Sequence, residues 1–259
     1  MTRDEWAHSH NPTAMLHFLH TKGSDRKLRL FACACCRSIW HLITDERSRH
    51  AVEVAEHFAD GRATDDELSD ANHVAGQLAE AIYGEAHKRA EAHATALALH
   101  EADWVHGAWE CAIHAMAGTA AGADASDTNP DTLKHTARSA VLAAVHAASP
   151  IHFEETTEPD MDARDRAERE QEVIQADLIR DIFGYPTRKP VPFDPAWRTD
   201  TAVALANGIY EQQAFDRMPI LADALQDAGC EDEVVLAHCR ADGRHVRGCW
   251  VLDLVLGYE

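Results

Sequence analysis

The feature that most constrains this fold is a helical periodicity of apolar residues that recurs along most of the chain. It is clearest in the stretch SDRKLRLFACACCRSIWHLI, which begins at Ser24. At 100° per residue, one face of a helix there carries nearly all the large apolar side chains. This pattern predicts an amphipathic helix that buries one stripe, made of Leu28, Phe31, Ala32, Cys35, Ile39 and Leu42.

Capping signals divide the rest of the chain into further helices. Ser24 is a typical N-cap residue, and Thr64 with Glu67 matches the capping-box spacing. Asn129-Pro130 has the cap-then-proline order of a helix start, whereas Gly61 and Gly184 are typical of helix ends. No alternation of strand-like and helix-like segments is evident, so the sequence predicts an all-α fold.

We expect two helical regions. A multi-helix bundle is predicted over 1–150, and short stacked helices over 165–259, the two packed as one unit. A polar segment at about 151–164 is the candidate linker. Within the second region, YPTRKPVPFDPAW has four prolines and predicts an extended connector held by Phe193 and Trp197.

The charge balance narrows the classes of partner. Lys and Arg number 24 against 44 Asp and Glu, a formal charge of −20. Such acidity argues against binding nucleic acid or an anionic membrane through phosphates and favours a protein partner. No apolar run reaches the roughly 20 residues that span a bilayer. The N-terminal residues lack the apolar core of a secretory signal, so we expect a cytoplasmic protein with its seven cysteines reduced.

Three stretches carry a resemblance to a known group of proteins. They are SDRKLRLFACACCRSIWHLITDERSRHAVEVAE, IYEQQAFDRMPILADALQDAGC and HVRGCWVLDLVLG. Together they resemble an uncharacterised all-helical family of planctomycetes, some members of which are labelled SMI1/KNR4-like. This resemblance covers both ends of the chain and implies no activity or catalytic residues.

The stretch HCRADGRHVRGCW concentrates metal-ligand side chains near the C-terminal end of the sequence. Zinc prefers four nitrogen or sulfur ligands in a tetrahedron. Cys33 and Cys36, one helical turn apart, together with two residues of the C-terminal stretch would supply such a set. The candidate zinc ligands are therefore Cys33, Cys36, His238, Cys239, His245 and Cys249.

Packing is the interpretation that the sequence favours for the same stretch. One helix would then end near Cys239, Gly243 would lie in a turn, and a new helix would start near His245 or Val246. Cys249 and Trp250 would pack inward from that last helix. On this interpretation Cys33 and Cys36 form, with Trp40, a second stripe beside the main apolar face.

The central helix offers a third candidate site. His106, Glu110 and His114 recur every four residues and lie on one side of the predicted helix. Glycine-rich phosphate loops and the common catalytic signatures are absent, so catalysis is left open. The sequence thus predicts an interaction or adaptor protein first, a zinc metalloprotein second, and an enzyme or ligand carrier with a pocket in the bundle core third.

Overall fold

A computed structural model describes residues 1–19, 23–93, 161–186 and 193–258. No strand occurs in these residues, so the all-α prediction is confirmed for them. The predicted helix start at Asn129-Pro130 and the trio of His106, Glu110 and His114 lie outside the described residues. The helices are α1 (Arg3–His8), α2 (Pro12–Leu19), α3 (Asp25–Ser38), α4 (Glu46–Ala59), α5 (Asp65–His93), α8 (Met161–Phe183), α9 (Asp200–Gln212), α10 (Met218–Asp227), α11 (Glu233–Arg240) and α12 (Trp250–Leu256), with 3₁₀ turns η1 (Pro195–Trp197) and η2 (Phe215–Arg217).

Local capping chemistry begins and ends several of these helices as predicted. The Ser24 hydroxyl accepts a hydrogen bond from the Lys27 amide at the start of α3. Thr64 and Glu67 form reciprocal side-chain bonds at the start of α5. Gly184, directly after α8, has a φ of +60°, which glycine adopts without the strain that a side chain would add.

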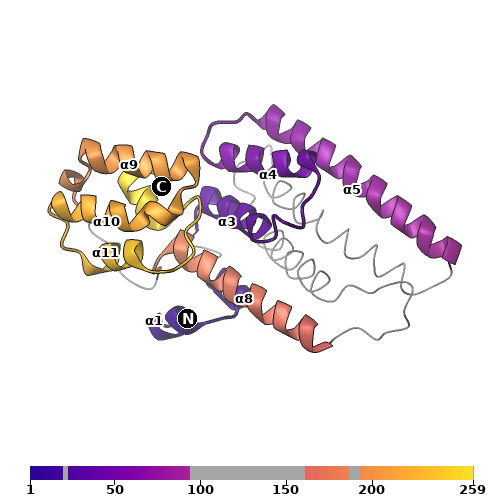
Figure 1. Ribbon diagram of the computed structural model, residues 1–259, viewed down its shortest axis with the longest axis horizontal. Coiled ribbons are helices and arrows are strands. Elements are labelled where there is room, and N and C mark those ends of the chain that lie inside the picture. Colours follow the sequence, from indigo (N-terminus) through magenta and orange to yellow (C-terminus); the bar gives the residue numbers. More distant parts are fainter. Residues whose placement is uncertain (20–22, 94–160, 187–192, 259) are drawn as a thin grey trace.

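The apolar residues separate into two clusters. The first, called the N-terminal cluster, joins buried residues of α1 to α5 with those of α8, from Trp6 to Ile182. The second, called the C-terminal cluster, joins buried residues of α9 to α12, from Ala202 to Val255. Figure 1 shows α9, α10 and α11 gathered at one end of the molecule, with α5 extending away and α3 and α8 in between.

Helix α3 is the centre of the N-terminal cluster because it packs against both α4 and α8. The predicted stripe of Leu28, Phe31, Cys35 and Ile39 is buried there. Its neighbours on the helix are buried as well. Three cysteines are at most 1% exposed, namely Cys33, Cys35 and Cys36. The expected division between a core stripe and an outer stripe is therefore absent, since helices cover α3 on more than one side.

Helix α8 differs from expectation in its start and its packing. It begins at Met161, so the last residues of the expected linker are helical. Its buried residues, such as Leu178 and Ile182, belong to the N-terminal cluster although the sequence placed the helix in the C-terminal region. The separation between the two clusters therefore falls after Phe183, in the proline-rich connector.

The described end of the connector behaves as predicted in one respect. Phe193 and Trp197 meet edge to face, with ring centroids 5.2 Å apart, and both pack against the C-terminal cluster. Residues Pro195 to Trp197 form the 3₁₀ turn η1, which the Asp194 carboxylate caps. This end of the connector is thus attached to the C-terminal cluster by aromatic packing.

No described helix combines the length and the apolar character required to cross a bilayer.

Candidate metal centre

Three parts of the chain bring four potential metal ligands to one point. Asp181 lies near the end of α8, and His238 lies on α11. His245 and Cys249 follow in the segment between α11 and α12. One ligand atom from each residue lies within 4.8 Å of all the others.

The individual distances describe a compact tetrad. Asp181 Oδ1 lies 2.7 Å from His245 Nδ1 and 3.1 Å from His238 Nε2. The sulfur of Cys249 lies 3.2 Å from His238 Nε2 and 3.9 Å from His245 Nδ1. Zinc bonds of roughly 2.0–2.3 Å place tetrahedral ligand atoms about 3.3–3.8 Å apart. The four distances given above, from 2.7 to 3.9 Å, scatter around this range.

The same atoms argue against a nucleophilic triad. A Cys–His–Asp triad uses the two different nitrogens of its histidine, one toward the nucleophile and one toward the carboxylate. Here His238 directs the single atom Nε2 at both Cys249 and Asp181. His245 likewise directs Nδ1 at both of those residues. Ligand atoms that converge on one point are typical of metal coordination, whereas the groups of a triad form a chain.

The local backbone explains this convergence. The predicted junction is present, since α11 ends at Arg240. The next helix, however, begins at Trp250 and not at His245 or Val246. The segment between them is not one helix, because Gly248 has a φ of +88°, outside the right-handed helical region. The Val246 amide donates to Asp181 Oδ2 at 2.9 Å. This bond fixes the carboxylate and directs Oδ1 toward the two histidines.

Burial sets the electrostatics of the tetrad. The Asp181 side chain is 3% exposed, and those of His245 and His238 are 5% and 14% exposed. Burial alone would raise the pKa of Asp181, but hydrogen bonds from His238 and His245 outweigh it and hold that pKa below its usual value. Burial, reinforced by Asp181, raises the pKa of the Cys249 thiol well above its usual value. The site therefore combines the carboxylate of Asp181 with the thiol of Cys249, and this thiol needs a nearby cation to ionise.

The structure places the other predicted ligands elsewhere. Cys33 contacts the Val52 carbonyl, 3.9 Å from its sulfur, and Cys36 is buried in the same N-terminal cluster. Cys239 is buried in the C-terminal cluster, where burial raises the pKa of its thiol to about 12. Of the six predicted ligands, His238, His245 and Cys249 are brought together in the tetrad, and Asp181 is the fourth member.

Asp181 was missed because it lies 57 or more residues before the other three in an acid-rich helix. One signal could have found it. Asp181 falls on the apolar stripe of α8, beside the buried residues Ile174, Leu178 and Ile182. A carboxylate on a buried stripe requires a polar partner from another element, because an unpaired buried charge is costly.

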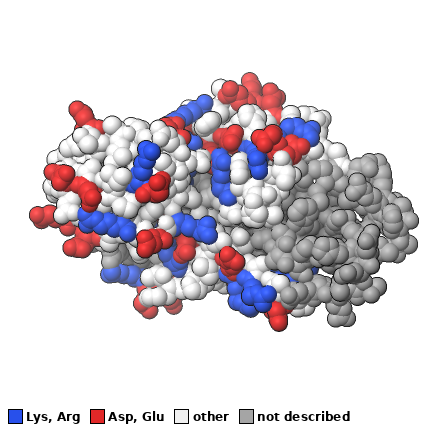
Figure 2. Space-filling model, in the orientation of Figure 1, with Lys and Arg blue, Asp and Glu red and all other residues white. Residues whose placement is uncertain are grey.

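The rest of the described surface offers a weaker candidate. An open hollow lies between α1 and α2, lined by residues that include His8, His17 and Phe18. Figure 2 shows acidic and basic side chains interspersed over the visible face, without a broad patch of one sign among the described residues. Neither feature brings buried metal-ligand atoms together as the tetrad does.

Searches against protein-family models, curated proteins and solved structures found no match for this chain.

Proposed function

We propose that this protein binds one zinc ion through Asp181, His238, His245 and Cys249. The observation that carries this proposal is the convergence of four buried ligand atoms within 4.8 Å of one another. The interaction or adaptor role expected from the sequence stays a prediction beside it.

The donor set favours zinc over other common ions. Calcium and magnesium prefer cages of oxygen atoms, whereas two imidazoles and a thiolate suit zinc. Charge balance points the same way. The ionised forms of Asp181 and Cys249 would together carry two negative charges, which a divalent cation neutralises inside a buried site.

The role we infer is structural. Catalytic zinc sites keep one coordination position for water or substrate, whereas structural sites use four protein ligands. Four side chains converge here, and all are mostly buried. Structural zinc contributes about 10–16 kcal/mol of binding free energy in zinc-finger peptides. A single intramolecular hydrogen bond contributes only about 1 kcal/mol, so metal occupancy would dominate the stability of this region.

The test is metal analysis of protein purified without a histidine tag. We expect one zinc per chain in the parent protein and its loss in Cys249→Ser and Asp181→Asn. Cobalt reconstitution should give a thiolate-to-cobalt charge-transfer band that is absent in Cys249→Ser.

Two matched cysteine variants control for nonspecific effects. Cys36→Ser and Cys239→Ser alter buried cysteines outside the tetrad and should keep the metal. Parent protein that takes up neither zinc nor cobalt would refute the proposal, and so would full zinc content in Cys249→Ser.

A further inference from the structure

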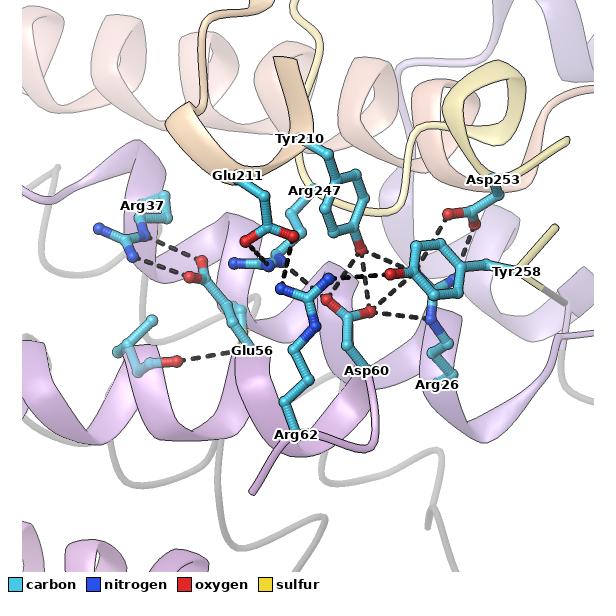
Figure 3. Close-up of polar contacts among 12 residues, drawn as sticks. Arg26, Arg37, Glu56, Asp60, Arg62, Tyr210, Glu211, Arg247, Asp253 and Tyr258 are labelled. Atoms are coloured by element: carbon cyan, nitrogen blue, oxygen red, sulfur yellow. Dashed lines mark hydrogen bonds and ion pairs between the residues drawn. The ribbon is translucent and has the colours of Figure 1, made fainter. Parts of the chain in front are cut away.

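The two apolar clusters meet at a junction that contains a buried ionic network. Asp60 lies directly after α4, and its completely buried side chain accepts hydrogen bonds from three side chains (Figure 3). Arg26 of α3 donates to its Oδ1 at 3.0 and 2.9 Å. From the C-terminal side, Arg247 donates to Oδ2 at 2.8 Å, and the Tyr210 hydroxyl donates to Oδ1 at 2.9 Å.

Further charged pairs connect the same two sides. Arg26 donates to Asp253 of α12 at 2.8 Å, and Lys27 lies 3.6 Å from the same carboxylate. Arg62, just after α4, pairs with Glu211 of α9 and donates to the Tyr258 hydroxyl at 3.0 Å. In each pair, one partner lies on α3 or just after α4, and the other lies on α9 or α12 or just after α12. Figure 3 labels the residues of the Arg26 and Arg62 pairs.

Among the described residues, some apolar groups also meet across this junction. The Leu30 side chain packs closely over Gly248, and the Trp250 ring packs over Gly184. Val246 adds a partly buried contact to the N-terminal cluster. Buried ion pairs gain little net stability, since desolvation offsets their attraction, and polar interfaces between compact units favour relative motion.

The metal tetrad crosses this same junction. Asp181 belongs to α8 and thus to the N-terminal cluster, whereas the other three ligands belong to the C-terminal side. We propose that metal binding at this tetrad controls docking of the C-terminal helices onto the N-terminal helices, and that metal release separates the two clusters without unfolding either. This inference rests on the proposed zinc site.

The first test measures docking by the distance between two spin labels. Val74 on α5 and Ile220 on α10 are 41% and 56% exposed and lie on opposite sides of the junction. Both would be changed to cysteine in a Cys111→Ser background, because Cys111 lies outside the described residues and the six described cysteines are buried. We expect one narrow distance distribution with zinc and a longer, broader one after chelation, while amide protection in α3 and α9 persists.

The second test uses a variant that touches no ligand. Because coupling between two equilibria is reciprocal, weakening the junction should weaken metal binding. Asp60→Asn should therefore lower zinc affinity by about tenfold, within the usual range of such coupling. Asp223→Asn removes an exposed carboxylate that pairs with Arg240 within the C-terminal helices, and should leave affinity unchanged.

The outcomes separate the two proposals. If the protein binds one zinc ion but the label distance is unchanged after chelation, the docking inference is overturned and the zinc site stands. Parental zinc affinity in Asp60→Asn has the same consequence. Loss of amide protection in both clusters on chelation would also overturn it. Absence of metal uptake would refute the zinc site and the inference together.

Discussion

Replacing Asp60 by asparagine gives the most direct measure of what the buried ionic junction contributes to stability. The Asp60 side chain is 0% exposed and faces the guanidinium groups of Arg26 and Arg247, whose side chains are 14% and 7% exposed. Asparagine keeps the shape but removes the negative charge and turns an amide N–H₂ toward a cation. Removing one partner of a buried ion pair costs about 3–5 kcal/mol, because the remaining charge stays desolvated.

The assay is thermal unfolding of zinc-saturated protein, followed by circular dichroism. For a chain of this size, 1 kcal/mol corresponds to about 2–4 °C in Tm, so Asp60→Asn should lower Tm by about 6–20 °C. Asp223→Asn is the matched control. Its ion pair with Arg240 has side chains 72% and 43% exposed, and exposed pairs contribute about 0–1 kcal/mol. Equal Tm values for the two variants would refute the view that burial of Asp60 makes its charge essential.

Two further predictions concern packing around the metal centre. Trp250→Ala should lower the free energy of unfolding in urea by about 3–5 kcal/mol, because Trp250 is 7% exposed and its ring packs against His238 with centroids 5.0 Å apart. The control Ile220→Ala, at an exposed position, should stay within about 0.5 kcal/mol of the parent. A small effect of Trp250→Ala would show that this ring is dispensable. Gly248→Ala should cost about 1–3 kcal/mol, because Gly248 has a φ of +88° and an added Cβ would lie 2.8 Å from the Leu30 side chain. At Gly243 nothing lies within 4 Å, so Gly243→Ala should be nearly neutral by the same measurement, and equal stability of the two alanine variants would contradict this account.

The helices and several of their ends could be predicted from the sequence because the interactions responsible are local. The cap at Ser24, the capping box of Thr64 and Glu67, and the end of α8 at Gly184 each depend on residues within about one helical turn. Three members of the tetrad also came from local reasoning. His238, His245 and Cys249 fall in one short stretch, where the residue types made them candidate ligands, although packing was the favoured interpretation.

Only the tertiary structure decided what completes that site. Packing brings Asp181 to the histidines from a distant helix, and it buries Cys33 and Cys36 in the N-terminal cluster instead. The Val246 amide also bonds to Asp181, and Gly248, with a φ of +88°, keeps α12 from starting before Trp250. A periodic pattern specifies which face of a helix is buried, but the element that covers this face depends on how the whole chain packs, and that long-range choice carries no signal in the local spacing of residues.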